Sequence, residues 1–269
     1  MRILVTGATG NIGRMVVDEL LALGADTVRA LTVDPARAAL PARVEVARGF
    51  LGRPATLPAA YANVDVLYLA PHLPTAAEAC RLAADAGISR IVDLAGPKGA
   101  HWQGIEDAVE ACGVPFTHLE PGEFMSNATL WARQIKTGDV VRDTCGDAVN
   151  APIAQEDVAA VAARVLLSDV HAGRSYELTG PEALSRRQKV ELIGQALGRE
   201  LHYVELPRDE AIAELTQDMG AHAAWYVDGQ QSLREHPQAA VPTVPALTGR
   251  PATTFLTWAR KHANLFQDS

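Results

Sequence analysis

Short apolar strands alternate with helical segments over the first 120 residues, and this alternation is the strongest constraint on the fold. The strand-like runs are apolar at almost every position, which is typical of parallel strands buried on both faces. Their alternation with helices predicts an α/β fold with a doubly wound parallel Rossmann sheet. We expect strands at residues 2–6, 28–32, 44–47, 65–70, 91–95 and 116–119, with helices at 11–23, 76–86 and 105–112.

The rhythm of strands and helices changes after residue 124. We therefore predict a Rossmann lobe at residues 1–124 and a smaller carboxyl-terminal α/β lobe at 125–269, which binds substrate, packs on the first lobe and is not an independent domain. The second half is expected to hold strands at 175–178 and 201–206, helices at 155–167, 185–197, from 209 onward and at 254–263, and a surface loop rich in Pro and Gly at 241–251.

The charge balance argues against two classes of partner. The chain carries 24 basic and 32 acidic residues, and its net charge of −8 repels nucleic-acid phosphates and anionic lipids. Its three cysteines form no CxxC pair, so we expect neither a disulfide framework nor a metal site. We find no apolar run of about 18 residues and no signal-type leader, which predicts a cytoplasmic protein without a membrane partner. A homodimer is compatible with the sequence and stays open.

A glycine-rich loop joins the first strand to the first helix. Its glycines are spaced as GxxGxxG, which permits a tight turn, close approach of the backbone to a pyrophosphate, and close packing of helix on strand. The amino end of the following helix offers unpaired N–H groups and a positive dipole to phosphates. The loop therefore predicts dinucleotide binding by Gly7, Thr9, Gly10, Asn11, Ile12 and Gly13.

Beyond this loop, several segments resemble the NmrA-like atypical short-chain dehydrogenases/reductases, a family of the NAD(P)-binding Rossmann superfamily. The resemblance implies a Rossmann lobe, a small carboxyl-terminal lobe and bound NAD(P)H. It is carried by residues 6–13, 28–32, 113–117, 121–127, 151–153, 177–182 and 248–251, together with Trp258.

The choice between NADPH and NADH depends on the end of the second strand, where an acidic residue holds a ribose hydroxyl and an arginine accepts a 2′-phosphate. Thr32 stands there and leaves room for a phosphate, which favours NADP(H) over NAD(H). The family commonly has arginine at the next position, and this chain has Val33. Arg37 remains as a phosphate ligand, or Arg29 if its side chain turns inward, while Asp34 either repels the phosphate or begins a helix.

Ligands of such sheets lie beyond the carboxyl ends of the strands, so further contacts are expected where later strands end. The cofactor is expected to contact Ala70, Pro71, Ala95, Gly96 and Pro121. The substrate pocket is expected to include His72, His101, Trp102, Glu123, Phe124, Met125 and Asn127. His72 and His101 equally suit solvated loop positions, Trp102 equally suits the core, and Phe124 and Met125 equally suit packing between the lobes.

The proton donor of the classical short-chain dehydrogenases is missing. Those enzymes use a Tyr-xxx-Lys pair, and no tyrosine of this chain has a lysine four residues later. Relatives that resemble isoflavone reductase carry a lysine where alignment places Trp102, and the family's arginine before Pro-Gly is Glu120 here. His101 and His72 are the weak candidates for an acid. Glu120 and Glu123 either form an acid pair whose repulsion raises one pKa, or face water or an arginine.

These features favour an NAD(P)H-dependent oxidoreductase that passes hydride to a quinone-like or aromatic small molecule. A quinone accepts hydride with little help from an acid, which suits a site without Tyr-xxx-Lys. Two alternatives stay open. One is a regulator of the NmrA type that senses NAD(P) without turnover, and the other is a tailoring enzyme in which the cofactor supports a redox-neutral step.

Overall fold

The computed structural model describes residues 1–96 and 102–267, and the chain divides into two compact units. The first unit comprises Met1–Gly122, Gln155–Leu178 and Thr243–Arg250, and the second comprises Glu123–Ala154, Thr179–Pro242 and Pro251–Ser269. The predicted boundary at residue 124 lies near the first crossing between the units. The chain then returns to the first unit twice, which the sequence did not indicate. Whether the second lobe depends on the first for folding stays a prediction.

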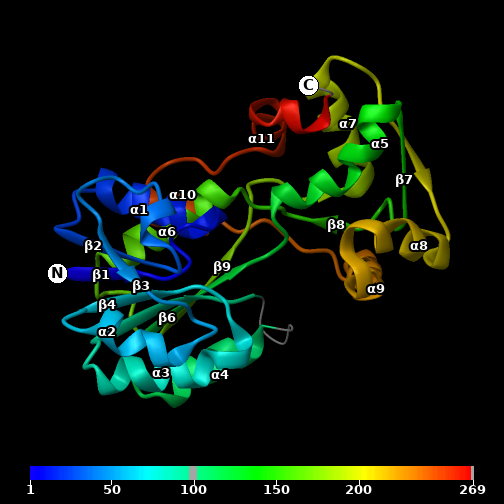
Figure 1. The fold of residues 1–269 in the computed structure, drawn as a ribbon. Helices are drawn as coiled ribbons and strands as arrows, with labels where there is room; N and C mark the ends of the chain where they lie inside the picture. Colours follow the sequence, from blue (N-terminus) through cyan, green and yellow to red (C-terminus); the bar gives the residue numbers. More distant parts are fainter. Residues whose placement is uncertain (97–101, 268–269) are drawn as a thin grey trace. The chain divides into compact units, whose positions relative to one another are not determined.

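The first unit is built on a seven-stranded sheet in which every neighbouring pair is parallel (Figure 1). The order β3-β2-β1-β4-β5-β6-β9 reverses at β1, so the predicted doubly wound topology is confirmed. The assignment of residues 155–178 to the small lobe was wrong, because the helix Gln155–Leu166 and the strand β9 belong to the first unit, where β9 extends this sheet beside β6. The strands are β1 Arg2–Val5, β2 Thr27–Thr32, β3 Glu45–Arg48, β4 Val66–Leu69, β5 Arg90–Leu94, β6 Phe116–Pro121 and β9 Arg174–Leu178.

Helices cover both faces of this sheet (Figure 1). On one face α1 packs against α6 and α6 against α10, and on the other face α3 packs against α2 and α4. Helix α6 is buried almost all round because it is rich in alanine and valine, which let neighbouring backbones approach closely. These helices are α1 Asn11–Ala22, α2 Leu57–Tyr61, α3 Ala76–Asp85, α4 Gln103–Ala111, α6 Gln155–Leu166 and α10 Thr243–Thr248.

Helix α10 corrects the surface loop predicted at 241–251. Pro245 lies in the first turn of α10, where a backbone N–H has no helical acceptor, so the proline does not break the helix. Val244 is fully buried, and the Thr248 hydroxyl donates to its carbonyl at 2.7 Å. The Pro and Gly content therefore did not predict the structure of this segment, because burial of the Val244 side chain favours a packed helix over a surface loop.

The second unit contains two sheets of two strands each among its described residues, together with several helices. Ser185 caps α7 as predicted, because its hydroxyl accepts from the Gln188 amide at 3.1 Å while the Gln188 side chain accepts from the Ser185 amide at 2.8 Å. Its core joins Met125, Trp131 and Phe255 to apolar positions of α5, α7 and α11. Its elements are α5 Ala132–Thr137, β7 Val140–Asp143, β8 Val149–Asn150, β10 Leu184–Ser185, α7 Arg186–Leu197, β11 His202–Glu205, α8 Arg208–Met219, α9 Ala223–Glu235 and α11 Phe255–Lys261.

Neither a membrane helix nor a metal site is found in the part of the chain that the structure describes. None of its helices is long and apolar enough to cross a membrane. Over the same residues, no group of three His, Cys, Asp or Glu side chains is arranged to hold a metal ion. The cytoplasmic location and the lack of a nucleic-acid partner stay predictions.

A buried acid–histidine cluster lies within the first unit. Asp93 on β5 and His118 on β6 face each other in register, with 2.7 Å between Oδ1 and Nδ1. Two carboxylates of α4 complete it: Glu110 lies 3.4 Å from His118 Nε2, and Glu106 is 2% exposed. Burial would lower the pKa of His118, but the hydrogen bond to Asp93 and the nearby carboxylates raise it. Burial raises the pKa values of Asp93 and Glu106.

We expect the free energy of unfolding to fall as pH rises above about 6.5, the ordinary pKa of histidine. The folded state holds the His118 proton more tightly than the unfolded state, so this stabilisation is complete below that pH and is lost as pH rises through the higher folded pKa. Denaturation of wild type and His118→Gln at pH 6 and pH 9 tests it. The stability difference between the two proteins should shrink at pH 9, and a difference that grows would contradict the assignment.

Candidate functional site

The loop between β1 and α1 has the geometry of a phosphate-binding turn. Gly7 adopts a φ of 61°, and the Gly10 amide donates to the Gly7 carbonyl at 2.9 Å, which closes the turn. Gly10 is the N-cap of α1, and no side chain caps this helix. The first-turn amides of Asn11, Ile12 and Gly13 therefore have no helical acceptor and, with the helix dipole, favour an anion.

The glycines of this loop serve different purposes. A Cβ at Gly13 would lie 2.2 Å from the Gly7 carbonyl oxygen, so only glycine allows α1 to pack this closely on the turn. A Cβ at Gly7 would lie 3.0 Å from the Ala70 Cβ. At Gly10 the nearest atom would be 3.2 Å away, and the residue is exposed. Gly13 is thus needed for packing, whereas Gly10 keeps the outer surface of the loop free for a ligand.

The predicted cofactor contacts on later strands end at the same edge of the sheet as this loop. Ala70 and Pro71 follow β4, and the Thr6 hydroxyl ties β1 to this point by donating to Tyr68 and accepting from the Ala70 amide. After β5, Ala95 and Gly96 are buried, and Pro121 is the last residue of β6. Parallel strands bring these positions to one edge, so the first unit holds every predicted cofactor contact. Their roles stay predictions.

The structure separates the two arginines considered for a 2′-phosphate. Arg29 pairs with Glu45 at 2.9 Å and donates to the Ala60 and Ala62 carbonyls, so its guanidinium is already committed. Arg37 is exposed, and its guanidinium forms no bond to any residue that the structure describes. Thr32, the last residue of β2, is buried.

Sequence reasoning missed a third arginine near this position. Arg48 ends β3 in register with Thr32 and is exposed. Arg48 is the last residue of the third strand, and that position could have identified it as a phosphate ligand from the sequence. It is a second candidate for the 2′-phosphate.

His72 and Trp102 both lie in the first unit, and their local contacts limit what each can do. His72 Nδ1 lies 2.7 Å from Thr75 Oγ1, and that hydroxyl donates to the Leu51 carbonyl. Nδ1 must therefore donate, and Nε2 of the neutral ring is an acceptor rather than an acid. Trp102 packs against Gly96 and the core beneath it. His101 lies outside the described residues.

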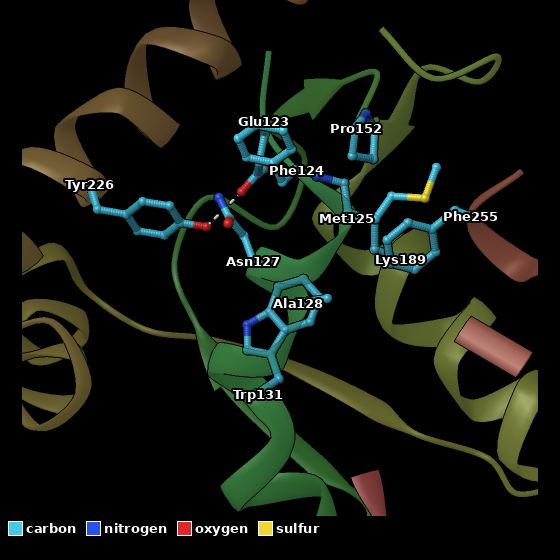
Figure 2. A pocket seen from close by; sticks show the side chains of 10 residues that line it. All are labelled: Glu123, Phe124, Met125, Asn127, Ala128, Trp131, Pro152, Lys189, Tyr226 and Phe255. Carbon is cyan, nitrogen blue, oxygen red and sulfur yellow. Dashed lines mark hydrogen bonds and ion pairs between the residues drawn. The ribbon is translucent and has the colours of Figure 1, made fainter. Parts of the chain in front are cut away.

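Four predicted pocket residues meet in one pocket of the second unit (Figure 2). They lie in the segment that follows β6, where Phe124 pairs with Ile153 and Met125 begins a 3-10 helix that extends to Trp131. The empty space among these side chains, open solvent included, is about 220 Å³. Apolar and aromatic side chains form most of its wall. The lining residues are Glu123, Phe124, Met125, Asn127, Ala128, Trp131, Pro152, Lys189, Tyr226 and Phe255.

Glu123 is the centre of the polar side of this pocket. Its Oε1 accepts from the Tyr226 hydroxyl at 2.8 Å, and its Oε2 lies 3.0 Å from Lys189 Nζ and accepts from the Asn150 amide. Burial alone would raise the pKa of Glu123, but the charges of Lys189 and Arg186 and these hydrogen bonds lower it to about 2. The hypothesis of an acid pair that raises the pKa of Glu123 is therefore wrong, because cations surround this carboxylate.

A second buried ion pair lies next to the pair formed by Glu123 and Lys189, and the Tyr226 hydroxyl connects the two. Arg186 and Asp143 form an ion pair with side chains 1% and 2% exposed, and Trp131 Nε1 donates to the same carboxylate at 2.6 Å. Arg186 also donates to the Tyr226 hydroxyl at 3.3 Å. Burial and the charge of Glu123 raise the pKa of Tyr226, so its hydroxyl keeps its proton. Burial lowers the pKa of Lys189, although Glu123 opposes this.

Sequence reasoning missed Lys189 and Tyr226. They come from α7 and α9, far along the chain from Glu123, and neither belongs to a motif with fixed spacing. The only signal for Lys189 was its position on the buried stripe of an amphipathic helix, next to Val190 and three residues after Arg186. Such a lysine is usually read as solvent-exposed, so only the packing of the second unit reveals it.

Comparisons with known proteins agree with this geometry. A family model for NAD(P)H-binding proteins matches residues 7–169. A (4-alkanoyl-5-oxo-2,5-dihydrofuran-3-yl)methyl phosphate reductase of Streptomyces griseus is 37% identical over 98% of this chain and 99% of its own. An NAD(P)H azoreductase of Xenophilus azovorans is 33% identical over 98% of this chain and 99% of its own. An NADPH-dependent quinone oxidoreductase of Escherichia coli, solved with NADPH, has a TM-score of 0.87 at 26% identity, covering 97% of this chain and 99% of that one.

Two glycine substitutions should separate ligand binding from packing. Gly10→Val should weaken NADPH binding roughly 10- to 100-fold, the loss of one or two charge-assisted contacts, with little change in melting temperature. Gly13→Ala should instead destabilise the fold by about 1–3 kcal/mol, because its Cβ meets a backbone carbonyl. Titration calorimetry and thermal denaturation measure the two effects. Unchanged NADPH affinity in Gly10→Val would overturn the assignment of this loop.

Proposed function

The chain belongs to the NAD(P)H-binding family, and on that premise we propose that it reduces a quinone-like or azo aromatic acceptor with NADPH. Membership bears out the resemblance to the NmrA-like atypical short-chain dehydrogenases/reductases that the motifs carry. The observation that carries the proposal is the phosphate loop, whose uncapped helix end and closed glycine turn fit a pyrophosphate. The relatives' own names, as reductases of azo, quinone and furanone compounds, support the class of reaction.

The residues of the first unit fit the cofactor's parts. The amides of Asn11, Ile12 and Gly13 would hold the pyrophosphate, and Ala95 and Gly96 would support the rest of the dinucleotide. Arg37 would bind the 2′-phosphate that distinguishes NADPH from NADH. When bound, the cofactor supplies a hydride, and the protein's part is to orient it and to exclude water.

The pocket of the second unit would receive the acceptor. Phe124, Met125 and Phe255 offer an apolar and aromatic wall for a flat ring. The side-chain amide of Asn127 forms no hydrogen bond with any residue that the structure describes, so this group could bind a carbonyl or azo group of the acceptor. A quinone spreads the charge that arrives with hydride over its ring, which reduces its need for acid catalysis.

NADPH oxidation against matched quinone and ketone acceptors tests this function. We expect quinones to be reduced about 10²–10⁴-fold faster than unactivated ketones, because a ketone concentrates the arriving charge on one oxygen and depends more strongly on general acid catalysis, whose usual range this is. Efficient reduction of the ketones would contradict the proposal. NADPH binding without turnover of any acceptor would instead favour the nucleotide-sensing role.

Cofactor preference has its own test. Arg37→Ala should weaken NADPH about 10-fold or more, as the loss of one charge-assisted contact implies, and leave NADH nearly unchanged. Calorimetric titration with both cofactors measures this, with Arg81→Ala on α3 as an exposed control. Equal losses for the two cofactors would show that Arg37 is structural. An effect at Arg48→Ala alone would move the role to β3.

A further inference from the structure

Lys189 is a buried ammonium that lines the pocket and is only partly committed. Its Nζ donates to Glu123 Oε2 and to Asn150 Oδ1. An ammonium has three N–H bonds, and the third has no acceptor among the described residues. The residue is 3% exposed, yet it borders the space assigned to the acceptor. This geometry leaves one proton of Lys189 available to a ligand.

The other polar groups around the pocket lack a proton to give. Glu123 is ionised, and Tyr226 has committed its single hydroxyl proton to Glu123. The indole N–H of Trp131 is committed to Asp143. The Asn127 amide donates hydrogen bonds but does not ionise, and the remaining lining residues are apolar. Lys189 is therefore the one group among the pocket's lining residues that can transfer a proton.

We propose that Lys189 is the catalytic acid that protonates the reduced acceptor, an assignment that rests on the proposed function. With a quinone, the C–H bond of the dihydronicotinamide breaks and its hydrogen passes with both electrons to one quinone oxygen. The other oxygen becomes anionic and takes a proton from Lys189 Nζ, so one N–H bond breaks and a second O–H bond forms. NADPH is oxidised, the quinone becomes a hydroquinone, and water returns a proton to the amine.

The hydroquinone oxygen and the lysine ammonium have acidities that suit this transfer. A phenol such as tyrosine and a lysine ammonium have ordinary pKa values of about 10 and 10.4, so the proton moves between groups of similar strength. Burial and the charge of Arg186 lower the pKa of Lys189, which makes it the better donor, although Glu123 opposes them.

The surroundings also tolerate a neutral lysine. After proton transfer, Glu123 keeps its hydrogen bonds from Tyr226 and Asn150 and the compensating charge of Arg186, which itself pairs with Asp143. Loss of the lysine charge therefore does not leave an isolated carboxylate in the interior.

The test compares two acceptors that differ in their need for a proton. A quinone needs one, whereas a cationic triarylmethane dye becomes neutral on taking hydride and needs none. Lys189→Arg keeps the positive charge beside Glu123 but holds its protons too tightly to act as an acid. We expect quinone turnover to fall about 10-fold in this variant, less than the usual 10²–10⁴-fold of general acid catalysis because the quinone ring spreads the arriving charge, with little change in dye turnover. Lys136→Arg, on the exposed face of α5, is the matched control.

The pH profile gives a second, independent result. Wild-type quinone turnover should fall at high pH as Lys189 deprotonates, while Lys189→Arg should lose this limb. A parallel loss for both acceptors would show that Lys189 only shapes the pocket, and unchanged quinone turnover in Lys189→Arg would also overturn the assignment. Dye turnover by wild type shows that cofactor and hydride transfer are intact, so a wild type that reduces neither acceptor overturns the proposed function itself.

Discussion

Four charged side chains are buried together in the second unit, and their mutual compensation determines what this unit can do. Glu123 pairs with Lys189 and Asp143 pairs with Arg186, with the Tyr226 hydroxyl bridging the two pairs. Removal of one partner of an isolated buried pair typically costs about 3–5 kcal/mol, whereas here the charge of Arg186 also compensates Glu123. The same arrangement keeps Glu123 ionised and Tyr226 protonated.

The first unit handles charge by a different means. Gly10 caps α1 without a side chain, and the expected attraction for a pyrophosphate comes from backbone amides and the dipole of α1. Backbone groups are held rigidly by the helix, so they cost no side-chain entropy when they bind. Gly13 is essential to this device because any larger residue would push α1 away from the turn.

The missing Tyr-xxx-Lys pair has a physical consequence for the chemistry. In the classical arrangement a lysine lowers the pKa of a tyrosine, whereas here the carboxylate of Glu123 lies between Lys189 and Tyr226. Burial and the carboxylate raise the pKa of the tyrosine, whose hydroxyl donates a hydrogen bond to Glu123, and in our proposal the lysine is the acidic partner. A tyrosine and a lysine thus line one pocket without forming the classical pair.

Sequence alone determined the features that local periodicity and backbone geometry encode. The six strands before residue 124, the glycine turn and the Ser185 cap follow from apolar runs, from residues without a Cβ and from local hydrogen bonding. Four pocket residues, from Glu123 to Asn127, were also predicted because they follow the end of a strand. The seventh strand and α10 were not assigned correctly, because their place depends on distant partners.

Only the tertiary structure decided which charges meet. Glu123, Lys189 and Tyr226 lie on three elements far apart in the chain, and no spacing rule joins them. The pKa of a carboxylate depends on the charges and donors around it, so Glu123 could not be distinguished from an exposed acid before its neighbours were known. Local sequence specifies the strands and turns, whereas burial and long-range packing specify the electrostatics of the pocket.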